Sequence, residues 1–282
     1  MNFSANDLEL VINKILFYLK EERSLDFTGN RVSMLERRIS KRIIFTGYNS
    51  FDDYYQYLIT HDKEIDKLVN VLTINVSSFF RDPLIWESLN KSILPELIEH
   101  KKGKKEESLR IWSAGCSSGE EPFSLAILLN EKLEQEEIHF DTHIFATDID
   151  AEILQKAKQS IYNYDSVKLT KLEFINKYFT ENKENYELNS NIREMVKFSF
   201  FDLLDEKKYT PPGSVFGNFD IVLCRNVLIY FRLEFQKRIF TKLHRALNRG
   251  GYLILGEAEV PIDEFRNEFR RVNNCCKIYQ KK

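Results

Sequence analysis

The sequence predicts an α/β protein: a mostly parallel, doubly wound sheet with a small inserted subdomain, preceded by an N-terminal all-α domain. Three observations support this. Apolar residues recur at helical spacing through about the first 75 residues, and from residue 109 short apolar strands alternate with helices. Residues 160–195 interrupt that alternation. Strands that alternate with helices are typical of a parallel sheet covered on both faces.

The chain therefore divides into three parts. Residues 1–75 are an N-terminal helical domain, residues 76–108 a linker region, and residues 109–282 a sheet domain with an insertion at about 160–195. The charged stretch His100–Glu107 closes the linker region. A length of 282 residues fits this division, because domains run to roughly 100–200 residues each.

Four helices are expected in the N-terminal part. Three of them begin at side chains that can cap free backbone N–H groups. These are Asn6 with Glu9, Asn30, and Ser50 with Asp53. The expected helices run through Leu19, over 31–45, onward from residue 50, and over 63–72.

The sheet domain shows strands at 109–113, 143–147, 196–201, 219–224 and 252–255. Helices are expected near 121–133, 151–159 and 233–247. The segment Cys275–Tyr279 can add a final edge strand.

Composition excludes several classes of protein. A net charge of −2 does not suggest a nucleic-acid coat. The chain has no run of about 18 apolar residues and no signal peptide, so we expect it to stay in the cytosol. There its cysteines are expected as free thiols, and no cysteine or histidine spacing indicates a metal site. The cysteines are Cys116, Cys224, Cys275 and Cys276.

The stretch Ile111–Pro122 predicts a ligand site. A strand ends there, a turn with Gly115 and Gly119 follows, and a helix begins, which is where nucleotide-like ligands bind in doubly wound sheets. The GxGxxG spacing of dinucleotide sites is absent, and Glu120-Glu121 at the helix start would repel a pyrophosphate. A sulfonium cofactor, S-adenosylmethionine, would not be repelled. Alternatively the glutamates only complement the helix dipole.

Polar residues follow the next three strands as well. Asp148 can accept hydrogen bonds from both ribose hydroxyls, while Asp150 could cap the next helix instead. Asp202 could accept from the adenine amino group or could be a turn residue. Arg225 and Asn226 come directly after a buried-looking strand, where active-site groups lie in this architecture.

These motifs together resemble the CheR family of chemotaxis-receptor methyltransferases over nearly the whole chain. Four segments carry the resemblance, and their common order makes it specific: Asn75–Asp82, Gly119–Ser124, Ala146–Asp150 and Cys224–Phe231. The resemblance implies a class I (Rossmann-like) methyltransferase fold and S-adenosyl-L-methionine as cofactor, with S-adenosyl-L-homocysteine as product. It also implies methyl ester formation on chemoreceptor glutamates, which adapts chemotaxis signalling.

The resemblance further implies a set of cofactor-binding residues. They are Asn75, Ser77, Arg81, Gly115, Glu120, Asp148, Asp202, Leu203, Arg225 and Asn226. Ser77 keeps the hydroxyl of the threonine usual in the family, whereas many relatives have Asn-Leu at Asp202-Leu203. Cys116 is read as a small turn residue rather than a nucleophile.

For catalysis we expect Arg81, Asn226 and Tyr230 to line the acceptor side. Arg81 would orient substrate or cofactor. Tyr230 lies in an apolar run, so a core position is an alternative.

A basic cluster in residues 31–42 carries a net charge of +4 and predicts a substrate-docking face. Its members are Arg31, Arg37, Arg38, Lys41 and Arg42. Arg31, Arg38 and Arg42 can share a helix face. That face would suit the helical, glutamate-rich methylation region that the resemblance implies, and a solvated basic surface is the alternative.

Some members of the family hold a receptor's C-terminal pentapeptide on the inserted subdomain, through a glycine-containing loop. The segment Thr180–Tyr186 has no glycine, so no such tether is expected. Two other functions compete with the main reading. One is a methyltransferase for a small molecule or another protein, and the other is a non-catalytic signalling module that binds the cofactor. The acidic and Arg-Asn motifs argue against a dead enzyme.

Overall fold

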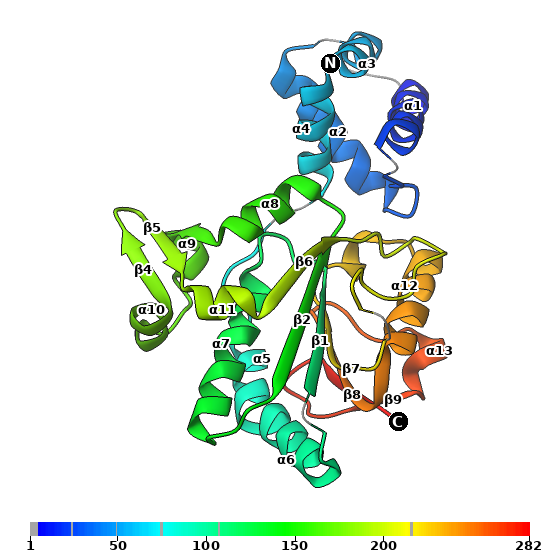
Figure 1. Ribbon diagram of the computed structural model, residues 1–282. Coiled ribbons are helices and arrows are strands. Elements are labelled where there is room, and N and C mark those ends of the chain that lie inside the picture. The colour runs from blue at the N-terminus through cyan, green and yellow to red at the C-terminus, as the bar shows by residue number, and fades with distance from the viewer. Residues whose placement is uncertain (1–4, 24, 49, 74–75, 107, 215–216) are drawn as a thin grey trace. The chain divides into compact units, whose positions relative to one another are not determined.

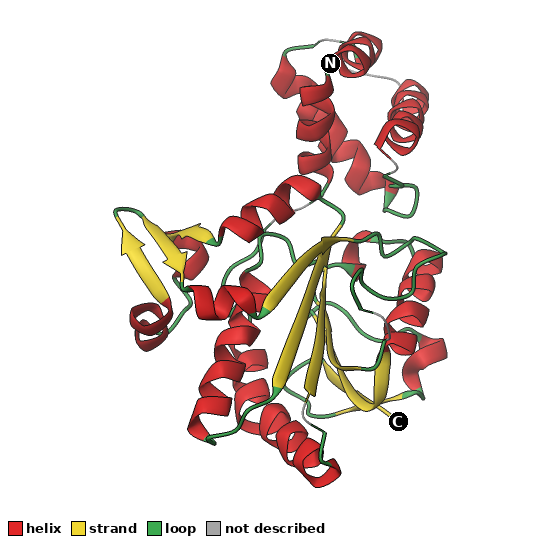
Figure 2. Ribbon diagram, in the orientation of Figure 1, coloured by secondary structure: helices red, strands yellow, loops and turns green. Residues whose placement is uncertain are grey.

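The computed structural model describes residues 5–23, 25–48, 50–73, 76–106, 108–214 and 217–282 (Figure 1). The chain forms two compact units. A helical unit comprises residues up to 75 together with Tyr230–Gln236, and a sheet unit comprises Val76–Ile229 and Lys237–Lys282. Figure 2 shows the strands of the sheet unit, with helices on both of its faces.

The helical unit buries the apolar stripes that its sequence predicts. Its helices are α1 (Ala5–Arg23), α2 (Val32–Thr46), α3 (Phe51–Thr60) and α4 (Asp62–Leu72). Ile15, Leu35 and Leu68 are almost fully buried in it. The predicted cap of α3 is confirmed, because Ser50 Oγ accepts a hydrogen bond from Asp53 N at 3.0 Å. The predicted cap of α2 is wrong: Arg31 is its N-cap residue, and no side chain caps it.

A short bridge joins the loop before α2 to a distant segment of the chain. Arg31 N donates to Tyr230 O, and Arg232 N donates to Gly29 O, both at 2.9 Å. Asn30 and Phe231 form the antiparallel bridge between these bonds. The segment Tyr230–Gln236 thus belongs to the helical unit, although it follows the fourth strand of the sheet.

A buried ion pair lies among the helices of this unit. The guanidinium of Arg42 forms two bonds to the Glu64 carboxylate, Nε to Oε1 at 2.7 Å and Nη2 to Oε2 at 2.6 Å. Tyr54 donates its hydroxyl to the same carboxylate at 3.0 Å. The Glu64 side chain is 1% exposed, so these partners replace the water that it loses on folding.

The central sheet has the order β6-β2-β1-β7-β8-β10-β9. Its strands are β1 (Ser108–Ala114), β2 (Asp141–Asp148), β6 (Val196–Phe200), β7 (Phe219–Cys224), β8 (Leu247–Leu255), β9 (Phe269–Arg271) and β10 (Ile278–Lys281). The first five strands in this order pair in parallel, which confirms the predicted mostly parallel sheet. The final strand expected at 275–279 is found as β10, shifted to 278–281, but its expected place at the edge is wrong. β10 pairs with both β8 and β9, and β9 forms the edge.

Alternate residues of the strands face opposite layers. Ile111, Leu223 and Ile254 pack in one layer with α7 (Glu120–Gln135), whereas Trp112 points to the other face, against Phe201 and Phe219. Further helices follow the strands: α8 (Ala151–Gln159), α11 (Ser190–Glu194) and α13 (Asp263–Arg266). The short 3-10 turn η2 (Leu228–Tyr230) and α12 (Leu233–Ala246) lie on either side of the segment Tyr230–Gln236 and each share residues with it.

Residues 76–108, expected to be a linker region, join the core of the sheet unit. They form α5 (Pro83–Ser88), the π-helical turn η1 (Leu89–Ile93) and α6 (Leu94–Lys104). Trp86, Leu89 and Ile98 of these elements are buried in the same apolar cluster as the strands. The apolar spacing here is irregular because helix type changes within a few residues, and this irregularity hides it in the sequence.

The insertion forms a separate small sheet, with the antiparallel order β3-β5-β4. Its elements are β3 (Ile161–Asn163), α9 (Tyr164–Val167), α10 (Leu172–Tyr178), β4 (Phe179–Asn182) and β5 (Asn185–Leu188). Asn182 pairs with Asn185, so Lys183 and Glu184 alone form the hairpin loop.

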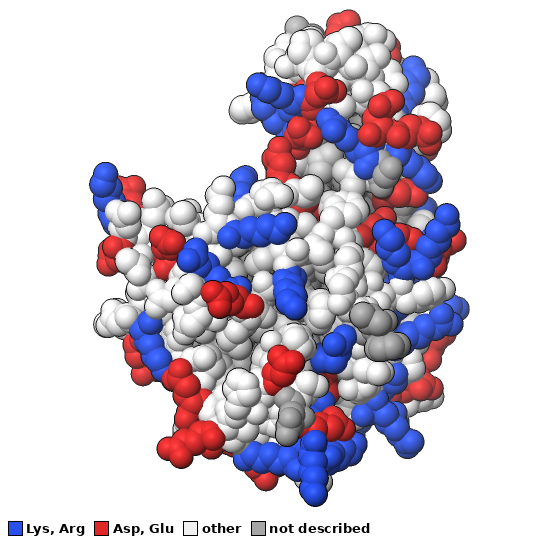
Figure 3. Space-filling model, viewed as in Figure 1, with Lys and Arg blue, Asp and Glu red and all other residues white. Residues whose placement is uncertain are grey.

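Acidic and basic side chains are interspersed over the face viewed in Figure 3. Within the described ranges, no helix is both long and apolar enough to cross a bilayer. The same residues hold no group of three or more His, Cys, Asp or Glu side chains that could bind a metal ion.

We expect Arg42→Met to destabilise the protein by about 3–5 kcal/mol, because it leaves the Glu64 carboxylate buried without its cation. Urea denaturation followed by circular dichroism measures the change. Lys41→Met is the matched control. It alters an exposed neighbour on the same helix and should stay within about 0.5 kcal/mol of wild type. Equal unfolding midpoints for the two variants would contradict a stabilising role for the buried pair.

Candidate active site

The candidate site lies at the carboxyl ends of the parallel strands, on either side of β1. The chain runs from β1 to β2 on one side and returns to β7 on the other, so the strand order reverses here. Loops on the two sides diverge at such a point and leave a crevice in which ligands bind. The polar residues predicted from sequence follow β1, β2, β6 and β7 at this edge.

The glycine turn after β1 is held against its neighbours. The N–H groups of Gly115 and Cys116 donate to Thr147 O at 2.8 and 2.9 Å. Gly115 has φ +78°, and a Cβ built on it would lie 2.4 Å from Val227 Cγ2. A side chain is therefore excluded here both by the backbone conformation and by the space.

Asp148 is positioned at the end of β2 by this turn. Its carboxylate accepts from Ser117 N at 2.8 Å and from Asp150 N at 3.0 Å. Burial raises the pKa of Asp148 to about 6. Asp150 caps α8 by accepting from Glu152 N and Ile153 N, which confirms its alternative role. Asp148 thus has oxygens fixed in place with lone pairs left to accept further bonds.

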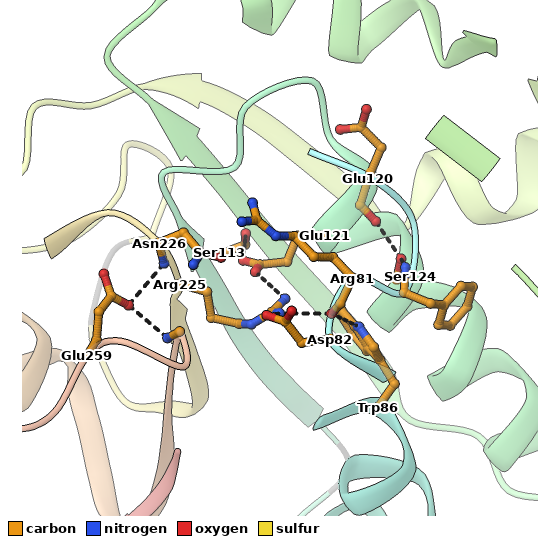
Figure 4. A network of polar contacts seen from close by, with 12 residues as sticks. Arg81, Asp82, Trp86, Ser113, Glu120, Glu121, Ser124, Arg225, Asn226 and Glu259 are labelled. Atoms are coloured by element: carbon orange, nitrogen blue, oxygen red, sulfur yellow. Dashed lines mark hydrogen bonds and ion pairs between the residues drawn. The ribbon is translucent and has the colours of Figure 1, made fainter. Parts of the chain in front are cut away.

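The two adjacent glutamates at the start of α7 have different surroundings, and Figure 4 shows their side chains pointing apart. Glu121 accepts from Ser113 Oγ at 2.8 Å and from Arg225 Nη1 at 3.0 Å. Glu120 accepts from Ser118 Oγ at 2.8 Å. Burial raises the pKa of both carboxyls. Within the described residues Glu121 has a cationic partner, and Glu120 forms no ion pair.

Arg225 connects β7 to the segment that leads into α5 (Figure 4). Besides Glu121, its guanidinium bonds Asp82 Oδ2 at 2.7 Å and the carbonyl of Arg81 at 2.8 Å. It also lies over the ring of Trp86, whose indole N–H donates to the same carbonyl at 2.7 Å. Three protein groups and a ring therefore surround Arg225. Its predicted contact with a cofactor stays a prediction.

The motif before α5 packs against the start of α7. Phe80 N donates to Ser124 Oγ at 3.0 Å, and Ser124 Oγ donates to Glu120 O at 2.6 Å. The hydroxyl of Ser77 lowers the pKa of Glu120, in opposition to burial. Arg81 Nη1 donates to Val76 O at 3.1 Å. The structure thus brings Ser77 to Glu120, whereas the predicted contact at Asn75 lies outside the described residues.

Of the other residues predicted to bind cofactor or substrate, Asn226, Asp202 and Leu203 belong to the sheet unit and Tyr230 belongs to the helical unit. Asn226 follows Arg225 in a left-handed conformation, with φ +58°. Asp202 Oδ1 accepts from Leu204 N at 2.7 Å, which is its alternative role as a turn residue, and Leu203 beside it is buried. Tyr230 is half-buried and belongs to the helical unit, so it is grouped apart from Asn226.

Cys116 in the glycine turn is buried, and burial together with Asp148 raises the pKa of its thiol well above the usual value. A thiol in this state is a poor nucleophile.

The predicted docking face is wrong in part. Arg31, Arg37 and Lys41 are exposed. Arg38 instead donates to Val71 O at 2.5 Å, and Arg42 binds Glu64. Arg38 and Arg42 lie beside the buried apolar stripe of α2, which packs against α4. Their guanidinium groups therefore reach the Val71 carbonyl and the Glu64 carboxylate of α4 instead of solvent. The set Arg31, Arg38 and Arg42 therefore does not form a common exposed face.

Several members of the site gave no clear sequence signal. Asp82 and Trp86 bind Arg225 from a segment expected to be a linker region. Glu259 accepts from the backbone N–H of Asn226 at 2.9 Å. Its position shortly after β8, like that of the other polar residues that follow parallel strands, is the sequence feature that indicates a place at this edge.

The residues fit a cationic nucleoside. Glu120 and Asp148 are buried carboxylates, and neither forms an ion pair with another described residue. Uncompensated buried charges are costly, so a bound cation would relieve them. The buried hydroxyl of Ser117, next to Asp148, has no hydrogen-bond partner among the residues that the structure describes. A single ligand could satisfy all three residues if it carried a positive charge and hydrogen-bond donors for the two carboxylates, and a hydrogen-bonding group for the Ser117 hydroxyl.

Together with the family model matched by most of the chain, these properties define the class of protein: an S-adenosylmethionine-dependent methyltransferase. Residues 75–277 match the SAM binding domain of CheR methyltransferase, and residues 11–73 match its all-alpha domain. The chain belongs to the CheR methyltransferase family, and its cofactor is S-adenosylmethionine.

Three relatives illustrate the likeness. The chain is 35% identical to a chemotaxis protein methyltransferase of Listeria monocytogenes, over 86% of each chain. It is 36% identical to chemotaxis protein methyltransferase 2 of Vibrio cholerae, over 86% of this chain and 82% of that one. It is 31% identical to a chemotaxis protein methyltransferase of Borreliella burgdorferi, over 92% and 93%.

We expect cofactor affinity to fall about tenfold between pH 7 and pH 5. With a pKa of about 6, the Asp148 carboxyl is mostly ionised at pH 7 and mostly protonated at pH 5, and the protonated form would accept more weakly from the two ribose hydroxyls that we expect it to bind. Isothermal titration calorimetry across this range measures the change. Asp148→Asn should bind weakly with a shallower pH slope, because Glu120 still titrates. Asp150→Asn keeps a helix cap and is the control. An unchanged slope in Asp148→Asn would exclude Asp148 as the source.

Proposed function

We propose that this enzyme methylates glutamate γ-carboxylates in the cytoplasmic helical region of membrane chemoreceptors, as a protein-glutamate O-methyltransferase, and so adapts chemotaxis signalling. The observation that carries the proposal is the full-length likeness, through both family domains, to relatives named chemotaxis protein methyltransferases. Such an activity would operate in the cytosol.

The chemistry asks for positioning rather than proton transfer. A glutamate carboxylate with a pKa near 4.3 is already ionised at neutral pH, so no general base is needed. Bound S-adenosylmethionine supplies an electrophilic methyl group. The protein has to align the acceptor oxygen with it and exclude water, which can be worth about 7–11 kcal/mol.

The side chains of the site suit this task. Arg81 and Asn226 can donate hydrogen bonds to an acceptor carboxylate without removing a proton. Charge is neutralised as the methyl group is transferred, so a strong cation clamp on the acceptor would favour the ground state and slow the reaction. Arg225 is already compensated by Glu121 and Asp82, at 3.0 and 2.7 Å. Its charge therefore contributes little to such a clamp.

For the substrate side we propose a docking face on the exposed side of α2. Arg37 and Lys41 lie four residues apart there, and Ile44 and Phe45 continue the same face with exposures of 68% and 80%. A basic surface that ends in an apolar patch suits an acidic, amphipathic receptor helix. The absence of a pentapeptide tether stays a prediction; the two-residue loop at Lys183-Glu184 is consistent with it.

Incubation with methyl-labelled S-adenosylmethionine and chemoreceptor cytoplasmic fragments tests the proposal. We expect base-labile label on receptor glutamates, because methyl esters hydrolyse in base. Fragments with the acceptor glutamates changed to alanine are the control. Stable label on another acceptor would indicate a different methyltransferase, and cofactor binding without transfer would indicate a non-catalytic signalling module.

We expect the double substitution Arg37→Glu, Lys41→Glu to raise the KM for receptor fragments about tenfold or more, because like charges would then face the receptor glutamates. Cofactor affinity should not change. Steady-state kinetics at several salt concentrations measures this, since the effect should weaken as salt screens the charges. The control is Lys67→Glu, Lys63→Glu on α4, with the same change in net charge. If both double variants raise KM equally, the docking face on α2 is excluded.

A further inference from the structure

Glu259 is a buried carboxylate in the loop after β8 whose role the proposed mechanism does not use. It is 3% exposed. Its Oε2 atom accepts from Gly256 N at 2.7 Å and from Asn226 N at 2.9 Å. Its Oε1 atom accepts from Leu228 N at 2.7 Å and from Ile229 N at 3.3 Å. One side chain thus binds four backbone N–H groups from two loops.

Burying the Glu259 carboxylate only to join two loops would cost free energy. Among the described residues no cation forms an ion pair with Glu259, so backbone dipoles alone compensate its charge. Burial raises the pKa of its carboxyl, while the four N–H groups lower it. A buried carboxylate without a cation is normally unfavourable. Its two oxygens accept from four backbone donors, and these bonds offset part of the cost of burying the charge.

Of the residues that Glu259 holds, Asn226 is the one expected at the methyl-acceptor side of the site. This residue has φ +58°, a conformation that non-glycine residues seldom adopt and that stores strain. A Cβ on Gly256 would lie 2.8 Å from both the backbone nitrogen and Nδ2 of Asn226. The Asn226 amide therefore packs directly on the Gly256 backbone, which Glu259 holds. On its other side, Arg225 is anchored by Glu121 and Asp82.

We propose that Glu259 is a positioning residue for methyl transfer, which holds the turn Arg225–Ile229 so that the Asn226 amide faces the methyl acceptor. The inference rests on the proposed function, in which Asn226 lines the acceptor side. Glutamine at 259 would present one acceptor oxygen and one NH₂ group, and that NH₂ would oppose backbone donors. The turn would then relax out of its strained conformation while the cofactor residues Glu120 and Asp148 keep their own partners.

The experiment compares Glu259→Gln with the matched control Glu257→Gln, an exposed glutamate two residues away. We expect Glu259→Gln to lower kcat for receptor methylation about 10- to 100-fold, because small misplacements of a positioned group have effects of this size. Cofactor Kd should rise by a smaller factor than kcat falls, because Asn226 is also an expected cofactor contact, and the binding stoichiometry should stay that of wild type. Glu259→Asp keeps the charge and should recover part of kcat. A purely structural role would instead lower the fraction that binds cofactor and leave kcat per bound site unchanged.

Two further measurements separate the outcomes. If Glu259 acts through Asn226, the double variant Asn226→Ala, Glu259→Gln should be no slower than Asn226→Ala alone. Amide hydrogen exchange of Asn226, Leu228 and Gly256 should quicken in Glu259→Gln, and it needs no methyl acceptor. Failure of the proposed function would appear in the wild-type enzyme, as missing label on glutamate. The inference itself is overturned if kcat in Glu259→Gln stays within twofold of wild type, if the double variant is additive, or if exchange at these amides is unchanged.

Discussion

The buried charge of Arg225 is the constraint on which the site depends. It lies between Glu121 at the start of α7 and Asp82 at the start of α5, and its bond to the Arg81 carbonyl adds a backbone contact. Three segments far apart in sequence therefore end at one guanidinium. Removing Arg225 would leave the buried Glu121 carboxylate without its cation, which is far more costly than losing a surface ion pair. The start of α7, the motif before α5 and the turn after β7 are joined through this contact.

Besides the helix cap Asp150, four buried carboxylates of the described residues lie at or near this edge of the sheet, and their partners differ. Glu121 is neutralised by a cation. Glu259 is solvated by backbone N–H groups. Glu120 and Asp148 receive hydrogen bonds but no cation from the described part of the chain. Glu120 and Asp148 accept fewer hydrogen bonds from backbone N–H groups than the four that Glu259 accepts, and this difference supports the prediction that they face the positively charged cofactor.

Several features that depend on neighbouring residues in the sequence were predicted correctly, whereas several that depend on contacts between distant segments were not. β7 was predicted with its observed bounds, Phe219–Cys224, because a buried strand is a continuous apolar run. The capping pair Ser50 and Asp53 was equally local. By contrast, the pairing of Arg42 with Glu64 depends on how two helices pack, which periodicity does not specify. The different roles of Glu120 and Glu121 follow from the 100° between successive helical residues, which turned one toward Arg225 and the other toward Ser118.

The bridge between residues 29–31 and 230–232 has a consequence for the modularity of the chain. The family's two domains follow one another in sequence, with a boundary near residue 75. The structural units do not follow that boundary. The segment Tyr230–Gln236 lies within the second domain's sequence but belongs to the helical unit, where Phe231 pairs with Asn30. A fragment cut at the boundary would lose the two backbone hydrogen bonds that join Arg31 to Tyr230 and Arg232 to Gly29. The helical unit is therefore completed by a segment from within the second domain's sequence, so the boundary between the two family domains is not a boundary between two independent folding units.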